Sequence, residues 1–320
     1  MCGSPMNTLK NNLSIILKYI EDKHDVIYLD YPLHHNVGDL LIYHGAISFL
    51  KDSGVKIKCQ RSVHDFDVSE IKGMITSQTT LLCHGGGNFG DIYPAHEKLR
   101  ELIISSFPDN RVIILPQTSH FSCKKELEKS IEIFNKHKNL IMFARDQQTL
   151  ETFKSLTKNA FLLPDMAHHL YGKLKLSASE KKGELYFLRT DSEVKLEQKK
   201  LNIPSGNKPM DWDDFLTPKD KLRRKCIERL VKFGVKFNSS AVKNFGAFLW
   251  YKHAILLIDK SSSYFSSFDD IITSRMHGHI LACLVNVNSQ LIDNSYGKNS
   301  GYFNQWTYKV NGARLYDEGN

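Results

Sequence analysis

The sequence predicts an α/β fold built on mostly parallel β-sheets, and two observations support this prediction. Short apolar segments alternate with longer amphipathic ones along most of the chain, as at 25–32, 39–54 and 55–60. This alternation is typical of strand–helix–strand units, which build parallel sheets. Polar residues also follow the apolar segments, for example NVGD at 36–39 and HGGGNFGD at 84–91. Ligands bind at the carboxyl ends of the strands in such sheets, so we expect a ligand site there.

The predicted elements follow in a regular order as far as residue 171. Apolar residues at helical spacing indicate helices, with Gly54 as a typical helix end, and short apolar runs indicate strands, with Pro32 as a stop. The expected helices are 7–21, 39–54, 93–108, 124–137 and 147–158. The expected strands are 25–32, 55–60, 79–83, 111–118, 140–146 and 160–171.

A second α/β unit follows the polar stretch 172–183, which is typical of a linker or a domain edge. Its expected elements are strands at 184–193, 271–273 and 289–294, a long loop at 194–218, and helices at 220–237, 241–265 and 280–284. A chain of 320 residues suits two domains of ordinary size. We therefore predict Rossmann-like domains at 1–172 and 173–320 with a cleft between them. The last residues are candidates to pack back on the first domain.

The composition is that of a soluble globular protein, with 41% hydrophobic residues, 24% charged residues and a mean hydropathy of −0.34. No apolar run reaches the roughly 18 to 20 residues that a membrane span needs. The first residues lack the apolar region of a secretory signal. The six cysteines are scattered without a CxxC pair. This pattern favours reduced thiols in a cytoplasmic protein over disulfides or a zinc site.

The formal net charge of +8 and the pI of about 9.0 point to an anionic partner. The sequence contains no recognised nucleic-acid-binding module, so we expect no nucleic acid partner. The apolar stretch 245–258 follows a group of basic residues, and it is either a buried helix or a surface that contacts an anionic membrane. The sequence carries no signal for an oligomeric state.

The segment DIITSRMHGHILACL, residues 270–284, is the strongest candidate for a functional site. It predicts a short strand, a tight turn and a helix of small residues. The N-terminus of such a helix binds anions through free backbone N–H groups and a positive dipole end. Arg275 and His277 add a fixed charge and a titratable group at this point. Arg145 and Arg189 also end predicted strands, so together with Arg275 they could surround a small polyanion.

Three other motifs have both a functional and a structural interpretation. The glycine-rich segment 84–91 is either a ligand cradle or a tight turn, and it fits neither dinucleotide nor P-loop patterns. Asp39 is either the cap of the following helix or a base in the cleft. Paired histidines such as His277 and His279 suggest a metal, but no cysteine or carboxylate is spaced to complete a site, so none is expected.

Six segments, taken in order, resemble the polysaccharide pyruvyl transferase family. They are NVGD (36–39), HGGGNFGDIYP (84–94), ILPQT (114–118), FARD (143–146), LPD (163–165) and TSRMHGHILA (273–282). The resemblance is weakest across 172–265. It implies two Rossmann-like domains arranged as in GT-B glycosyltransferases, with an interdomain cleft. It also implies phosphoenolpyruvate as donor, a sugar diol of a surface-polysaccharide repeat unit, often lipid-linked, as acceptor, and a cyclic pyruvate ketal plus phosphate as products.

The resemblance and the strand-end residues together give a set of candidate roles. His277 is the expected general acid, and Asp39 is the expected base or orienting group for the acceptor hydroxyl. No cofactor beyond the donor is expected. The candidate residues are, for catalysis, His277, Arg275 and Asp39; for donor binding, Arg145, Arg189, Arg275, His277 and Gly278; and for the acceptor or the cleft lining, Asn36, Asp39, Gly86, Gly87, Asn88 and Gln117.

Two other functions remain open at this level. One is a GT-B glycosyltransferase that uses a nucleotide sugar. Many such enzymes hold the ribose with a C-terminal Glu, but from Arg275 onward the sequence has only Glu318. The other is a non-catalytic glycan- or nucleic-acid-binding protein. A lipid-linked acceptor would place the protein in the cytoplasm at the inner face of the membrane.

Overall fold

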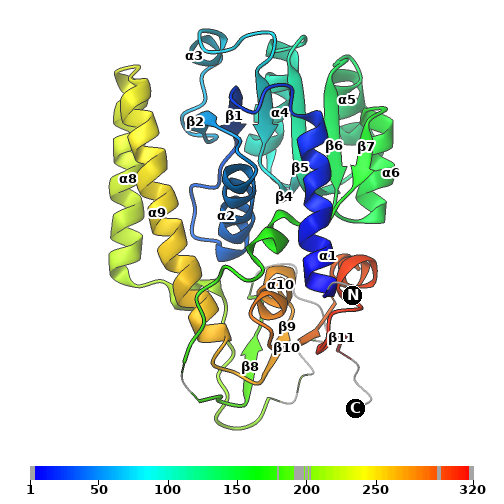
Figure 1. Ribbon diagram of the computed structural model, residues 1–320, viewed down its shortest axis with the longest axis vertical. Helices are drawn as coiled ribbons and strands as arrows, with labels where there is room; N and C mark the ends of the chain where they lie inside the picture. Colours follow the sequence, from blue (N-terminus) through cyan, green and yellow to red (C-terminus); the bar gives the residue numbers. More distant parts are fainter. Residues whose placement is uncertain are drawn as a thin grey trace.

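Two parallel β-sheets, each flanked by helices, form the architecture of this chain (Figure 1). The computed structural model describes residues 4–178, 180–190, 198, 201, 203–293 and 297–316. Within these residues one sheet has seven strands and the other has four. The predicted α/β class with parallel sheets is therefore confirmed.

The larger sheet has the strand order β2-β1-β3-β5-β6-β7, with β4 paired to β5 outside this path. Its strands are β1 (Val26–Leu29), β2 (Ile57–Arg61), β3 (Thr80–Cys83), β4 (Gly86–Gly90), β5 (Arg111–His120), β6 (Leu140–Ala144) and β7 (Ala160–Leu162). The order reverses at β1, because β2 lies on one side of it and β3 on the other. A reversal of this kind opens a crevice at the carboxyl ends of the two strands.

Helices cover both faces of the larger sheet. They are α1 (Pro5–Asn12), the 3₁₀ segment η1 (Leu13–Tyr19), α2 (Val37–Asp52), α3 (Val68–Lys72), α4 (Pro94–Ser106), α5 (Lys124–Phe134), α6 (Gln147–Leu156) and the 3₁₀ segment η2 (Met166–Leu170). The inner strands β1, β3 and β6 are buried on both faces, as expected for a covered parallel sheet. In β1, for example, Val26 and Tyr28 belong to one core cluster, whereas Ile27 and Leu29 belong to the other.

The smaller sheet has the order β11-β10-β9-β8. Its strands are β8 (Glu184–Phe187), β9 (Asp270–Thr273), β10 (Asn288–Leu291) and β11 (Ala313–Leu315). The accompanying segments are the 3₁₀ segment η3 (Trp212–Phe215), α10 (Met276–Leu284), α11 (Lys298–Tyr302) and the π-helical segment η4 (Phe303–Thr307). The core cluster that contains Val26 continues to Phe187 and Ile271 of this sheet, so one apolar core links the two units.

A long helical hairpin, α8 (Pro218–Lys236) and α9 (Ser240–Phe265), stands beside the larger sheet (Figure 1). Thr217 and Asp220 form a capping box at the start of α8, and Pro218 occupies its first turn. Trp250 of α9 is fully buried, and its Nε1 donates to the carbonyl of Pro32, 2.5 Å away. The hairpin belongs by sequence to the second predicted domain, 173–320, yet its helix α9 packs on α2 and β2 of the first.

The C-terminal segment also reaches the first unit. Trp306 Nε1 donates to the carbonyl oxygen of Arg145 at 2.7 Å, and the Tyr302 hydroxyl accepts from the backbone N–H of Asp165 at 3.2 Å. The division of the chain into domains 1–172 and 173–320 remains a prediction.

Some element predictions were wrong. The glycine-rich segment expected as a loop contains strand β4. A β-carbon at Gly90 would lie 1.9 Å from the carbonyl oxygen of His120, so glycine permits this close strand pairing. The expected strand 160–171 ends at Leu162 and continues as η2, because Pro164 interrupts it and Asp165 caps the next turn through Ala167. Part of the expected strand 184–193 and of the expected loop 194–218 lies outside the described residues.

Candidate active site

A pocket of about 350 Å³, called here the central pocket, opens where the carboxyl ends of both sheets meet. It takes residues from the crevice beside β1 and β3 and from the ends of β8 and β9. Its lining is His34, Asn36, Asp39, Gly87, Asn88, Tyr93, His96, Arg145, Arg189, Trp212, Arg275, Met276, His277, Lys298 and Asn299. The pocket is rich in cationic and imidazole side chains, which suits a small anionic ligand.

The start of α2 forms one wall. Asn36 is the N-cap, and its side-chain oxygen accepts from the N–H of Gly38 at 3.0 Å. Asp39 therefore does not cap this helix, although it lies in the first turn. Its Oδ2 lies 3.7 Å from Nε2 of His34. The carboxylate of Asp39 is left available at the pocket surface.

A buried polar cluster behind this wall positions Asn88. Asp30 directly follows β1 and has a positive φ of 65°, an unusual conformation for a residue other than glycine. Its two oxygens contact His96 Nδ1 at 2.6 Å and Arg100 Nη2 at 3.0 Å. Arg100 also donates to the backbone carbonyl of Asn88 at 3.0 Å and to its side-chain oxygen. Gln117, which does not line the pocket, donates to the same Asn88 oxygen at 3.2 Å.

The turn before α10 forms the opposite wall. Arg275 is fixed by a two-point contact with Asp211, from Nε to Oδ1 at 2.9 Å and from Nη2 to Oδ2 at 2.5 Å. Gly278 does not line the pocket. A β-carbon there would lie 2.6 Å from Thr273 Oγ1 and 2.9 Å from Phe187 Cδ1. Glycine at this position thus allows α10 to pack closely against the sheet.

The carboxylate of Asp165 joins Arg145 to His277. Asp165 is fully buried after β7, and its Oδ2 lies 2.5 Å from Arg145 Nη1 and 3.3 Å from His277 Nε2. Burial raises the pKa of this carboxyl, but His277 and Arg145 outweigh burial and hold the pKa well below its ordinary value. An ionised carboxylate therefore fixes the orientation of both side chains.

His277 also packs against the first turn of α2. A β-carbon at Gly38 would lie 2.9 Å from both Cβ and Nδ1 of His277. The N-terminal turns of α2 and α10 therefore touch at this point. Two helix N-termini facing one pocket favour negative charge inside it.

Lys298 and Arg145 approach the glycine-rich strand from the other side. A β-carbon at Gly87 would lie 2.9 Å from Lys298 Nζ and 3.0 Å from Arg145 Nη2. Glycine at this position leaves room for both cations. The remaining arginine, Arg189, is buried at the end of β8, and its backbone N–H donates to Ser274 Oγ at 3.0 Å.

Most of the residues predicted for the site thus lie around one pocket, although their catalytic roles remain predictions. The predicted residues that line it are Asn36, Asp39, Gly87, Asn88, Arg145, Arg189, Arg275 and His277. Gly86, Gln117 and Gly278 lie behind its surface. Gly86 is close to Asp39, since a β-carbon there would lie 3.8 Å from Oδ1 of that residue.

Several residues of the site, in the pocket lining or directly behind it, were not predicted as site residues. Asp165 could have been noticed, since it ends the motif LPD at 163–165, but it lies inside the expected strand 160–171. Lys298 lies in a polar tail with no periodic pattern, and His96 lies within a predicted helix, so neither carried a signal. Among the described residues, no group of three or more His, Cys, Asp or Glu side chains is arranged to hold a metal ion. No described helix is long and apolar enough to cross a membrane.

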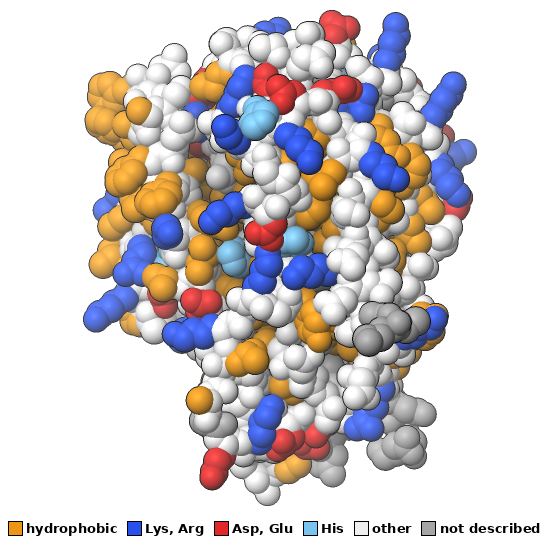
Figure 2. All heavy atoms as spheres, in the orientation of Figure 1, with side chains coloured by type: hydrophobic (Ala, Val, Ile, Leu, Met, Phe, Trp, Pro, Cys, Tyr) orange, Lys and Arg blue, Asp and Glu red, His pale blue; other side chains and the backbone are white. Residues whose placement is uncertain are grey.

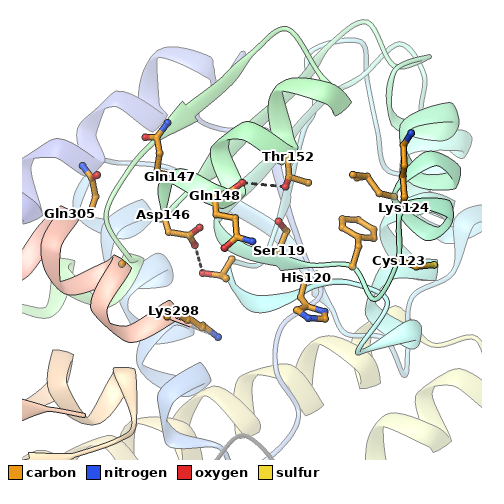
Figure 3. A pocket seen from close by; sticks show the side chains of 15 residues that line it. Ser119, His120, Cys123, Lys124, Asp146, Gln147, Gln148, Thr152, Lys298 and Gln305 are labelled. Atoms are coloured by element: carbon orange, nitrogen blue, oxygen red, sulfur yellow. Dashed lines mark hydrogen bonds between the residues drawn. The ribbon is translucent and has the colours of Figure 1, made fainter. Parts of the chain in front are cut away.

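Two further cavities adjoin the central pocket. One, of about 500 Å³, lies between β5, α5, α6 and α11 and shares Lys298 with the central pocket. In Figure 3, Ser119, His120, Gln148 and Lys298 surround this space. The second, of about 520 Å³, is called here the α8 pocket and is considered below.

Comparison with known proteins identifies the family of this chain. Residues 36–296 match the family model of polysaccharide pyruvyl transferases. EpsO of Bacillus subtilis (strain 168), named as a candidate pyruvyl transferase, is 34% identical over 312 residues, covering 97% of this chain and 94% of EpsO. Pyruvyl transferase 1 of Schizosaccharomyces pombe is 25% identical over 322 residues, covering 96% and 76% of the two chains.

A solved structure has the same overall fold. It is that of an uncharacterized protein, KP1_0663, from Klebsiella pneumoniae, with a TM-score of 0.63 and 20% identity, covering 97% of this chain and 99% of the other. The fold and the pocket define an α/β protein with a cationic pocket where the carboxyl ends of its two parallel sheets meet. This chain belongs to the polysaccharide pyruvyl transferase family.

Proposed function

We propose that this protein transfers pyruvate from phosphoenolpyruvate to a sugar diol of a surface-polysaccharide repeat unit, forming a cyclic ketal and releasing phosphate. The observation that carries the proposal is the convergence of Arg145, Arg275 and Lys298 with a carboxylate-held His277 in one pocket. Phosphoenolpyruvate carries a carboxylate and a phosphate, which such cations bind well. We place the pocket in a cleft between two Rossmann-like domains arranged as in GT-B enzymes.

The reaction requires a proton donor and cationic side chains that bind the carboxylate and phosphate of the donor. Protonation of donor carbon 3 makes carbon 2 electrophilic, and an acceptor hydroxyl then attacks carbon 2. The bond between carbon 2 and the phosphate oxygen breaks, and the second hydroxyl closes the ketal ring. One diol proton replaces the proton given to carbon 3, and the other leaves with phosphate. His277 is the proposed acid, oriented by Asp165, and Asp39 is the proposed base for the acceptor.

The cations stabilise charge that grows on the departing phosphate. Fixed donors of this kind are usually the largest contribution to catalysis. Arg275 is held by Asp211, and Arg145 is held by Asp165, so neither must reorganise when the donor binds. Lys298 approaches from α11 and closes the pocket on the remaining side.

A coupled assay tests this function. Purified protein is incubated with phosphoenolpyruvate and a galactoside-type diol, and we expect phosphate release together with a product heavier by one pyruvate. Arg275→Ala and His277→Ala should abolish turnover while the melting profile is kept. Wild-type rates in either variant would show that the roles are assigned wrongly. Release of a nucleoside diphosphate from a sugar nucleotide, with no turnover of phosphoenolpyruvate, would support a glycosyltransferase instead.

We also propose that the α8–α9 hairpin docks on an anionic membrane, at the cytoplasmic face, where a lipid-linked acceptor is presented. Large apolar side chains are exposed along the hairpin, among them Phe233, Phe245 and Phe248. An apolar groove between the two helices is bordered by Arg223 and Lys252. Figure 2 shows apolar and basic side chains interspersed over this part of the surface, at the left of the view. This mixture is typical of helices that lie on membranes.

A further inference from the structure

The α8 pocket, of about 520 Å³, has no role in the chemistry described above. Its lining is His35, Asn36, Thr190, Asp211, Trp212, Asp213, Leu216, Lys221, Arg224, Lys225 and Arg275. Three of these residues, Asn36, Trp212 and Arg275, also line the central pocket. The two pockets are therefore adjacent and meet at these three side chains.

The wall contributed by α8 is cationic. Lys221, Arg224 and Lys225 are spaced by three and four residues, so they lie on one face of the helix. Lys221 and Lys225 are exposed, whereas Arg224 is half-buried beside Glu228, with Nε 3.3 Å from the carboxylate. These three cations face solvent-accessible space.

The acidic residues of this pocket do not cancel its positive charge. Asp211 is bound to Arg275, and its Oδ2 also accepts from Thr190 Oγ1 at 3.1 Å. Asp213 is the other carboxylate in the lining. The lining carries four positive charges (Lys221, Arg224, Lys225 and Arg275) and two negative ones, a net of +2, and Glu228, which pairs with Arg224 from outside the lining, reduces this to +1.

His35 adds a polar group without a partner. Its ring is nine-tenths buried, and Nε2 makes no hydrogen bond within the described part of the chain. The pKa of His35 is lowered to about 4, mainly by burial and secondly by the positive charge of Arg224. The ring is therefore neutral at pH 7. A buried neutral nitrogen without a partner is costly unless water or a ligand bonds to it.

We propose that the α8 pocket binds the diphosphate end of the acceptor, with the sugar diol lying in the central pocket. This inference rests on the proposed function. Phosphate groups favour Lys and Arg at close range, and the shared boundary at Arg275 joins the diphosphate to the reacting sugar. A lipid diphosphate sugar and a nucleoside diphosphate sugar present the same chemistry here.

The test compares acceptors with one variant and one matched control. The variant is Lys221→Ala with Arg224→Ala and Lys225→Ala. The control is Lys219→Ala with Arg229→Ala and Lys232→Ala, which removes the same charge from exposed positions of α8 outside this pocket. Alanine keeps the helix in both. The acceptors are a neutral methyl glycoside, a short-alkyl diphosphate glycoside and a nucleoside diphosphate sugar, all with the same sugar.

We expect the variant to raise the KM for a diphosphate acceptor roughly tenfold or more, the effect of losing about 1.4 kcal/mol of binding. The KM for the neutral glycoside and for phosphoenolpyruvate should stay unchanged, and the control should match the wild type throughout. The short-alkyl diphosphate glycoside and the nucleoside diphosphate sugar are then compared. The one whose KM rises more in the variant is the class of acceptor that the α8 pocket binds. Inorganic pyrophosphate should compete with the favoured acceptor in the wild type and about tenfold more weakly in the variant.

Two results would contradict the proposal that the α8 pocket binds the diphosphate. One is an equal KM for the diphosphate acceptors in variant and wild type. The other is an increase confined to phosphoenolpyruvate, which would make the pocket part of the donor site. Absence of pyruvyl transfer to any acceptor in the wild-type protein would instead contradict the proposed function, so the two failures can be told apart.

Discussion

At the scale of single residues, Asp165 joins side chains from both walls of the site. It contacts Arg145 and His277 through one oxygen, while its other oxygen accepts from the N–H of Ala167 at 2.9 Å. Tyr302, whose hydroxyl lies 2.8 Å from His168 Nε2, covers it from the C-terminal segment. A carboxylate with this many partners positions the site and need not touch the substrate.

Replacing Asp165 with Asn should disturb the orientation of Arg145 and His277 without unfolding the protein. The amide oxygen can still cap η2, but an NH₂ group facing Arg145 repels its donors. We expect kcat to fall by about a hundredfold or more, the usual cost of misplacing a catalytic group by about 1 Å. Steady-state kinetics and circular dichroism provide the measurement. Asp67→Asn, which exchanges one good N-cap of α3 for another, should remain active. An Asp165→Asn enzyme with wild-type kcat would refute this role.

Gly38 offers a second test at this scale. The residue is helical, so alanine suits its backbone, but a methyl group would sit 2.9 Å from His277. We expect Gly38→Ala to displace the imidazole and lower kcat at least about tenfold, with little loss of helix stability. Gly73→Ala is the matched control, because its β-carbon would meet nothing closer than 3.5 Å. Equal kcat values for the two variants would show that the contact with His277 has no catalytic importance.

At the scale of elements, a buried ionic cluster fastens α9 to the larger sheet. Glu70 of α3 binds Arg61 of β2 through both oxygens, at 3.0 and 2.5 Å, and Lys243 of α9 at 2.5 Å. The three side chains are at most 4% exposed. Ser240 of α9 also donates to Glu70 at 2.5 Å. The hairpin is thereby held by charge as well as by the burial of Trp250.

Glu70→Gln should therefore destabilise the protein strongly. It leaves two buried cations without compensation, and breaking a buried ion pair in this way costs about 3 kcal/mol or more. Urea unfolding gives the free energy of unfolding directly. Glu151→Gln, which breaks an exposed pair with Lys154, should change it little. Similar midpoints for the two variants would mean that the cluster does not stabilise the attachment of α9.

The same cluster predicts how stability depends on pH. Burial raises the pKa of Glu70, but hydrogen bonds from Arg61, Lys243 and Ser240 outweigh it and lower the pKa to about 2. A depressed carboxyl pKa stabilises the folded state above the unfolded value, near pH 4.5, and this contribution disappears as the pH falls toward 2. The wild type should lose about 3 kcal/mol more than Glu70→Gln over this window. Parallel pH profiles of unfolding would contradict the assignment.

At the scale of the whole molecule, the positive charge is concentrated in one element pair. In α8, eight basic and two acidic residues give +6, and in α9 three basic and one acidic residue give +2. The sum, +8, equals the formal net charge of the whole chain. The rest of the protein is therefore neutral in balance, and any long-range attraction to an anionic surface is directed at the hairpin.

Membrane docking through this hairpin can be measured by co-sedimentation. We expect the wild type to bind phosphatidylglycerol vesicles at low salt, to lose binding as salt rises, and not to bind zwitterionic vesicles. Phe233→Ser with Phe248→Ser should weaken binding at least about tenfold, since each inserted ring contributes about 2 kcal/mol. Leu102→Ser with Leu176→Ser, exposed elsewhere, is the control. Failure of the wild type to bind anionic vesicles at low salt would rule out docking.

Much of the fold could be predicted from the sequence because its signals are local. Apolar periodicity located the strands around β1, β3 and β6 and the helices α2, α8 and α9 within a few residues. Periodicity could not show that one face of the stretch 245–258 is buried while another is exposed. Trp250 lies in the core while Phe248 is half exposed, because α9 packs on α2 along only one face.

The α/β class, the family and most residues of the central pocket were predictable from the sequence alone, because in a parallel sheet the carboxyl end of every strand reaches the same edge. Three features became visible only in the three-dimensional contacts: Asn36 rather than Asp39 caps α2, Asp165 holds Arg145 and His277, and Lys298 completes the pocket. The contact between Asp165 and His277 joins residues 112 positions apart, and Lys298 approaches Gly87 from a segment still farther along the chain. No local pattern encodes them, since they arise where independently folded elements meet.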